Sequence, residues 1–244
     1  MTEHPIIMTG ESVRGILDRR ETQTRRVPST ANSLLDGYRV GGRGERRWIW
    51  DGLDWSRARV DPGPSPAGNP GPYWRVPCPE NETEHRVYCL YQPGDRLWVR
   101  ETWAQIFTGE SCLNTISERN HCPCGGCRVE HRADTGDKYP GEWPADMGAD
   151  PECPKWRSSR YMPRWASRLT LEVVSVRAER VRDITEEDAK AEGARSVHIE
   201  HLGQTWKTHR AGFEILWDSI NAKRGYGWDT NWPVWPITFK VVNA

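Results

Sequence analysis

Two threonines and three arginines crowd into residues 20–26, which read RETQTRR. Arginine offers planar, paired N–H donors and threonine offers a hydroxyl, so the group suits a phosphate or the edge of a base. If the segment is extended, Thr22, Thr24 and Arg26 share one face, while Gln23 and Arg25 share the other. We expect the motif to contact an anionic or acceptor-rich ligand through Arg20, Thr22, Thr24, Arg25 and Arg26.

Two other interpretations of this motif stay open. One is a solvated helix end whose arginines pair with Asp18 and Glu21. The other is catalysis, in which a threonine nucleophile would need a base to take its proton. Glu101, a charged residue in a polar strand, is a candidate base for such chemistry.

A second basic group is KWRSSRYMPRWASR, residues 155–168, which holds five basic residues and no acid. Its cations alternate with Trp156, Tyr161 and Trp165, a composition typical of surfaces that hold a phosphate backbone and stack on unpaired bases. We expect Arg164 and Trp165 to contribute to binding. The alternative is that Trp165 fills the core and the arginines are solvated.

The segment LWVRETW, residues 97–103, alternates as a strand does. Leu97, Val99 and Glu101 would share one face, and Trp98 and Arg100 the other. Whichever face is inward buries a charge, which indicates either a paired charge or a cleft residue. We favour the cleft, with Arg100 binding the ligand.

A tryptophan-rich loop, GYGWDTNWPVW, spans residues 225–235. Its Trp228 would either stack on a base at the cleft or seal the core, and the sequence favours neither.

Four of the seven cysteines lie between residues 112 and 127. In HCPCGGC, residues 121–127, a C-x-x-C turn lets two thiolates meet one Zn²⁺, and two further cysteines would complete a tetrahedral structural site. Cys153, His121, His131, Cys78 and Cys89 are other possible ligands, and free reduced thiols are the alternative to a metal. We expect a structural Zn²⁺ held by Cys112, Cys122, Cys124 and Cys127.

Composition excludes several classes. The chain of 244 residues has 34 basic and 34 acidic side chains, which argues against coating DNA by bulk charge. Only 36% of residues are hydrophobic, and no apolar run approaches the roughly 20 residues that span a bilayer. The N-terminus lacks a signal peptide's pattern, so we expect a cytoplasmic protein without a membrane partner.

The elements that must position these groups are mostly strands. We expect strands at residues 5–8, 22–27, 96–103, 128–133, 169–181 and 234–242, and helices at 12–20, 184–193 and 211–221. Gly, Pro and Arg dominate residues 28–79, where 61–72 cannot be regular and 46–55 would form a hairpin turning at Asp51-Gly52. The pattern predicts an α+β fold: one domain, residues 1–244, forming a small β-barrel with short flanking helices and loop insertions at about 28–88 and 108–158.

The blocks GILDRRETQTRR, QPGDRLWVRETW, YMPRWASRLTLEV, ITEEDAKAEG, LWDSINAKRGYGW and VWPITFKVV resemble phage and prophage proteins of the ASCH family. These blocks cover about half of the chain and exclude both insertions. The resemblance implies a PUA-like β-barrel with a cleft that recognises a nucleic acid or nucleoside. In family members that are amidohydrolases the motif resembles G-R-K-T-x-T-x-R, which places its threonines on Thr22 and Thr24, its last arginine on Arg26 and a helix glutamate on Glu192.

The lysine position of that motif is Glu21 here, and a carboxylate supplies neither the charge nor the amine of a lysine. The function we expect is therefore recognition of RNA, of single-stranded or modified nucleic acid, or of a nucleoside, in a cleft lined by the arginine–threonine motif and aromatic rings. One alternative is a hydrolase, either a ribonuclease or an acetylcytidine amidohydrolase, using Thr24 and Glu192. The second alternative is a phage accessory protein that binds a host protein through its Trp-rich insertions.

Overall fold

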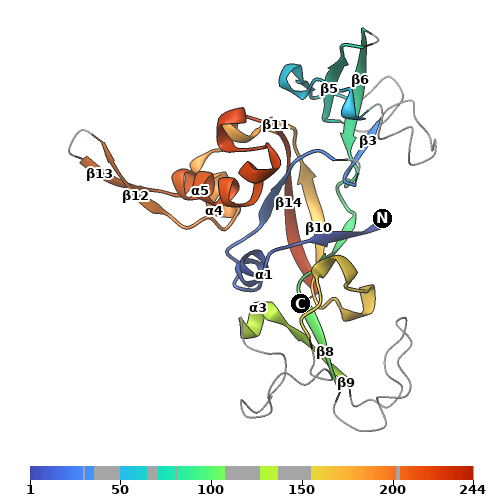
Figure 1. Ribbon diagram of the computed structural model, residues 1–244, viewed down its shortest axis with the longest axis vertical. Helices are drawn as coiled ribbons and strands as arrows, with labels where there is room; N and C mark the ends of the chain where they lie inside the picture. The colour runs from blue at the N-terminus through green and yellow to red at the C-terminus, as the bar shows by residue number, and fades with distance from the viewer. Residues whose placement is uncertain are drawn as a thin grey trace. The chain divides into compact units, whose positions relative to one another are not determined.

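The computed structural model describes residues 1–29, 31–35, 50–64, 71–80, 82–107, 127–136, 155–201 and 204–243. The protein is α+β and mostly sheet, with few short helices (Figure 1). The expected class is confirmed, whereas the PUA-like barrel stays a prediction. The chain divides into two compact units that alternate along the sequence: unit 1 is Met1–Arg19, Arg96–Glu172 and Val241–Ala244, and unit 2 is Arg20–Asp95 and Val173–Lys240.

Unit 1 is built on three strands. β1 (Glu3–Ile7) pairs in parallel with β7 (Arg96–Arg100), and the first residues of β10 (Thr170–Val176) pair antiparallel with β7. Leu97 and Val99 of β7 are fully buried. The period-two pattern therefore predicted the strand, and the structure decided that the face of Leu97, Val99 and Glu101 is the buried one.

Helix α1 (Gly10–Leu17) follows β1. The hydroxyl of Thr9 accepts a hydrogen bond from the backbone N–H of Ser12, 3.1 Å away, so Thr9 is the N-cap. The helix therefore begins before residue 12, where the sequence was expected to start it. Val13 is fully buried, whereas Leu17, at the last position of the helix, is 37% exposed.

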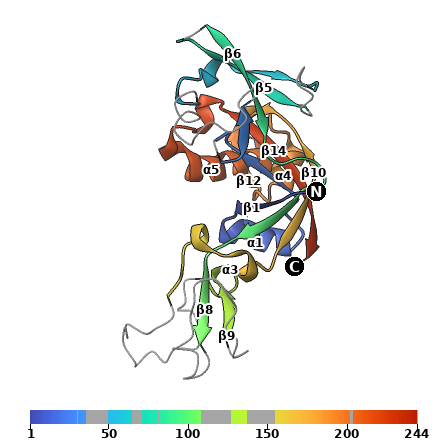
Figure 2. The same cartoon turned by 90° about the vertical axis from the view of Figure 1, so that its right-hand side faces the viewer.

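A strand pair and a short helix complete unit 1 (Figure 2). β8 (Trp103–Phe107) pairs antiparallel with β9 (Cys127–His131), which runs directly into α3 (Arg132–Thr135). Two 3₁₀ helices follow in the basic segment, η3 (Ser159–Tyr161) and η4 (Arg164–Ala166). The small core here consists of Trp103, Met162 and Ala166, with Val129 and Trp165 packed against it.

In unit 2 the strand β14 (Pro233–Asn243) is central. Its neighbours are the last residues of β10, the short β11 (Glu179–Arg180) and β2 (Gln23–Arg26). Three of its side chains are fully buried: Val234, Trp235 and Ile237. The apolar run expected to close the chain as a strand does so.

A second, four-stranded antiparallel sheet lies within the first predicted insertion. Its order is β3-β6-β5-β4, and the strands are β3 (Ser33–Leu35), β4 (Arg59–Asp61), β5 (Tyr73–Cys78) and β6 (Thr83–Cys89). Trp74 and Val76 of β5 and Val87 of β6 are buried almost completely. The described parts of residues 28–88 therefore include a regular sheet, which corrects the expected irregular insertion, because apolar residues of β5 and β6 gather into a buried sheet face.

The expected hairpin around Asp51-Gly52 is also wrong. Trp50 and Asp51 are helical, and η1 (Trp55–Arg57) follows, capped by the carboxylate of Asp54. The centres of the Trp50 and Trp55 rings lie 5.1 Å apart, so the two rings contact each other in this helical segment.

Two helices in unit 2 match the sequence closely. Thr185 caps α4 (Glu186–Ala191) by accepting from the Asp188 N–H at 3.1 Å, and Gly193 ends it with φ of 74°. The expected helix of residues 211–221 is α5 (His209–Asn221). Its Phe213 and Trp217 are buried, whereas Ile220 is 45% exposed.

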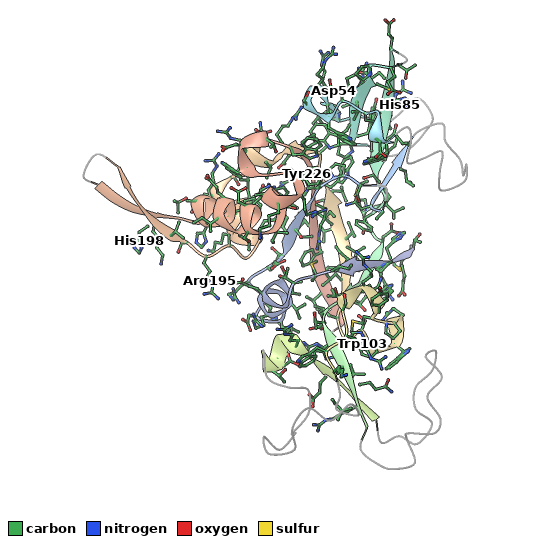
Figure 3. The ribbon with its side chains drawn as sticks, in the orientation of Figure 1. Asp54, His85, Trp103, Arg195, His198 and Tyr226 are labelled. Atoms are coloured by element: carbon green, nitrogen blue, oxygen red, sulfur yellow. The ribbon has the colours of Figure 1, made fainter. Side chains whose placement is uncertain are left out.

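Between these helices the chain forms a hairpin that the sequence analysis missed. β12 (Val197–His201) pairs with β13 (Gln204–Thr208), and the pair extends away from α4 and α5 in Figure 1; His198 and the preceding Arg195 are labelled in Figure 3. Three further 3₁₀ helices complete unit 2: η5 (Val181–Asp183), η6 (Ala222–Arg224) and η7 (Trp228–Thr230). Within the described ranges, no helix combines the length and apolarity needed to cross a membrane.

Candidate nucleic-acid interface

Strand β2 carries the arginine–threonine motif in unit 2. It pairs antiparallel with β14, placing Thr24 opposite Ile237 and Gln23 opposite Thr238. Opposed residues share a face of the sheet, and the Thr238 hydroxyl donates to Gln23 Oε1 at 3.3 Å. Thr24 therefore shares the face of the buried Ile237, and the alternation expected for this segment is confirmed.

The end of α4 lies directly beside the start of β2. The Thr22 N–H donates to the Ala191 carbonyl oxygen at 2.8 Å, and Glu21 and Glu192 form an isolated antiparallel bridge. The structure thus brings the motif and the predicted helix glutamate together, although they lie far apart in the sequence.

Arg25 is the centre of this junction. Its side chain is 0% exposed, and its guanidinium donates to Glu192 Oε1 at 2.9 Å, Asp188 Oδ2 at 2.9 Å and Glu179 Oε2 at 3.0 Å. The Arg25 backbone N–H also donates to Glu192 Oε2 at 2.8 Å. The face of β2 that meets Glu192 is therefore that of Arg25, not that of Thr24.

Arg177 and Gln23 extend the same network. Arg177 donates to Asp188 at 2.7 Å and to Gln23 Oε1 at 3.1 Å, and its Nε lies 2.9 Å from Glu179. Gln23 Nε2 in turn donates to Glu192 Oε1 at 3.2 Å. We call Gln23, Arg25, Arg177, Glu179, Asp188 and Glu192 the arginine–carboxylate cluster. Because its guanidinium donors are directed at carboxylates of the same chain, the cluster joins β2 to α4.

Burial and charge act in opposite directions on the acids of this cluster. Burial raises the pKa of Glu192 above its ordinary value, although Arg25 and the hydrogen bonds from Arg25 and Gln23 oppose the change. Burial would also raise the pKa of Asp188, but hydrogen bonds and charges from Arg25 and Arg177 together outweigh it, so that pKa is lowered. Asp188 is therefore stabilised as a carboxylate.

The remaining residues of the motif differ in exposure. Arg20 and Thr22 are exposed, while Arg26 is partly buried. Burial lowers the pKa of the Arg26 guanidinium, against the opposing charges of Tyr91, Glu192 and Glu21.

Glu101, the other candidate base, belongs to unit 1 and is 1% exposed. Arg168 donates to its two carboxylate oxygens at 3.0 and 3.2 Å, and also to Asp134 at 2.8 Å. Of the two interpretations of this strand face, the structure shows the paired charge.

The other face of β7 carries Trp98 and Arg100. The Arg100 guanidinium lies 5.5 Å from the centre of the Trp98 ring, and that of Arg164 lies 5.9 Å from it. Arg100 forms no ion pair with any residue in the described ranges. Burial lowers the pKa of Arg100, and no carboxylate offsets the effect.

In the basic segment 155–168, which also belongs to unit 1, an arginine again lies over a tryptophan ring. The Arg157 guanidinium lies 5.3 Å from the ring centre of Trp103, which Figure 3 labels, and the Tyr161 ring is 73% exposed. Lys155, Arg157 and Arg160 are exposed and pair with no described carboxylate. By contrast, Trp165 packs edge-on against Trp103 at 5.7 Å and belongs to the core.

Trp228, for which two roles were open, lies in the core of unit 2 with Phe213, Trp217 and Val234. The predicted zinc ligands Cys112, Cys122 and Cys124 lie outside the described residues, and Cys127 enters only as the first residue of β9. Within the described residues no group of three or more His, Cys, Asp or Glu side chains is placed to hold a metal. Cys78 and Cys89 are free and buried in unit 2, and burial raises the pKa of the Cys89 thiol to about 12.

Sequence reasoning missed three members of the cluster: Arg177, Glu179 and Asp188. Arg177 and Glu179 follow β10 without any local signal. Glu179 and Asp188 lie more than 150 positions from Arg25, and Arg177 lies as far from its partner Gln23, so no spacing rule connects them.

Comparison with known proteins gave no match. No family model matches the chain, and neither does any curated protein or solved structure.

Proposed function

We propose that this protein binds nucleic acid through an arginine–aromatic surface of unit 1, formed by residues 155–164 with Trp98 and Arg100. The proposal rests on how two guanidinium groups of this surface are placed. Arg100 and Arg157 lie over tryptophan rings and pair with no described carboxylate. They keep their charge and their hydrogen-bond donors for a ligand.

Phosphate is the partner that such groups suit. Arginine forms paired hydrogen bonds with phosphate oxygens, and exposed rings such as Tyr161 stack on bases without regard to sequence. A local surface of this kind also explains how a chain with no net charge would hold a polyanion.

The resemblance to ASCH proteins and the PUA-like barrel it implies belong to the same proposal. The junction of β2 with the end of α4 supports them only in bringing Glu192 to the strand of the motif, where it meets the face of Gln23 and Arg25 rather than that of Thr22, Thr24 and Arg26. The ligand class is RNA, or single-stranded or modified nucleic acid.

Fluorescence anisotropy with labelled 20-nucleotide RNA and single-stranded DNA, over a range of salt concentrations, tests the proposal. We expect binding that weakens steeply with salt, since each phosphate contact releases counterions. A triple variant, Lys155→Gln with Arg157→Gln and Arg160→Gln, should reduce the slope of log K against log salt by about 2, from roughly 0.7 per lost contact.

A matched control removes three exposed cations from unit 2: Arg59→Gln, Arg182→Gln and Lys190→Gln. This variant has the same net charge as the test variant and should bind as the unmodified protein does. Absence of binding at low salt would refute the proposal, as would equal losses in the two triple variants.

A further inference from the structure

The face of the unit 1 sheet that carries Trp98 is partly exposed: Trp98 is half-buried, and its neighbour Thr170 is buried. On β7 the ring of Trp98 has Pro5 of β1 on one side and Thr170 of β10 on the other, in register. Pro5 is exposed, and so is Ile7, which is in register with Arg100. An aromatic ring thus stands in the middle of a three-stranded sheet beside small or exposed neighbours.

The two arginines on this ring are held differently. The guanidinium of Arg100 has only the Trp98 ring as a partner among the described residues. Arg164 reaches the ring from η4, with its Nε 3.3 Å from Glu3 and one terminal nitrogen 3.4 Å from the Thr170 hydroxyl. Both members of the Arg164–Glu3 pair are almost half exposed, and ion pairs of that kind are weak, so a ligand phosphate competes easily with Glu3.

We infer that Trp98 is a stacking site for an unpaired nucleobase, with Arg100 and Arg164 binding the phosphates on either side of it. The inference rests on the proposed function and specifies its ligand as a single strand. In a duplex each base is already stacked and paired within the helix, and only an unpaired base offers its face to a protein ring. Charge complementarity favours this ligand, because two guanidinium groups lie over the ring, although the exposed Pro5 and Ile7 stand beside it.

The test compares Trp98→Leu with the unmodified protein on a single-stranded 20-mer and on a duplex of the same length, at one salt concentration. We expect Trp98→Leu to weaken single-strand binding at least fivefold, the lower bound of a lost stacking contact, and to change duplex binding less than twofold. Trp232→Leu, which removes a half-buried tryptophan from unit 2, should change neither.

A second variant tests whether a loss of binding in Trp98→Leu comes from a folding defect. Trp98→Phe keeps an aromatic ring, so it should retain most of the single-strand affinity while losing part of the tryptophan quenching that the oligonucleotide causes. Unchanged single-strand affinity in Trp98→Leu, or equal losses on single strand and duplex, would overturn the stacking site. Either result would leave the proposed function standing if the salt-dependent binding persists, whereas absence of all binding would refute both.

Discussion

At the scale of single residues, arginines in this protein fall into two groups with opposite consequences. Arg25 is buried and surrounded by three carboxylates, so its donors serve the fold. Arg100 lies over a ring and faces no described carboxylate, so its donors remain available. Local sequence does not distinguish the two, since each is an arginine in a polar strand.

The first prediction concerns Arg25. Arg25→Met removes the guanidinium and leaves Glu192, Asp188 and Glu179 as buried or half-buried acids with one fewer cation. We expect the free energy of unfolding to fall by about 3–5 kcal/mol, as for other buried pairs that lose one partner. Urea denaturation followed by circular dichroism measures the change.

Arg75 offers the matched control in the same unit. It pairs with Glu84 on the surface, where an ion pair contributes about 0–1 kcal/mol. Arg75→Met should therefore change stability little. A loss in Arg25→Met no larger than that in Arg75→Met would show that the cluster does not hold β2 to α4.

At the scale of elements, a side chain of α4 binds backbone N–H groups at the start of α5. The Glu186 carboxylate accepts from the backbone N–H groups of His209 at 2.5 Å and Arg210 at 3.0 Å, so α4 caps the N-terminus of α5. Gly212 in α5 lies directly against the backbone of Arg195. The contact requires a residue without a side chain at this position.

The second prediction follows from that contact. In Gly212→Ala the new Cβ would overlap the Arg195 carbonyl oxygen, and backbone cannot move aside as a flexible side chain does. We expect a loss of about 3 kcal/mol or more, at the upper end of overpacking effects. Thermal denaturation of the variant would show it.

Gly10→Ala is the control for that substitution. Gly10 begins α1, and an added Cβ would meet no atom closer than 3.7 Å. Its stability should change by less than about 1 kcal/mol, or rise slightly, because alanine favours a helix. A similar loss in both variants would mean that the Arg195 contact is not the cause.

At the scale of the whole molecule, unit 1 contains a core cluster of Trp103, Met162 and Ala166, and unit 2 contains one with Phe213, Trp217 and Trp228. Each depends on tryptophan, which explains how a chain with so few hydrophobic residues buries enough apolar surface. The cysteine-rich residues 112–126 join the two strands β8 and β9.

The third prediction is the zinc site proposed for that connection. We expect one Zn²⁺ per chain by elemental analysis, because a polar segment with little core gains its stability from a metal. The double variant Cys124→Ser with Cys127→Ser should lose the metal, and Cys78→Ala, whose thiol is buried in the sheet of unit 2, should keep it. A folded, metal-free protein would refute the site.

The sequence by itself determined the elements whose rules are local. Alternation in LWVRETW predicted β7, and the segment of residues 184–193 was expected to hold the helix α4, as it does. The sequence analysis missed the sheet of residues 33–89 because proline and glycine obscure the alternation of apolar residues there. It missed the hairpin of residues 197–208 because the two strands are short and polar.

Only the tertiary structure decided which charges are paired. It joined Arg25 to Asp188 and Glu192, and Glu101 to Arg168, while leaving Arg100 over Trp98. The physical reason is that an ion pair depends on distance in space, and strand pairing brings together residues that no sequence period relates.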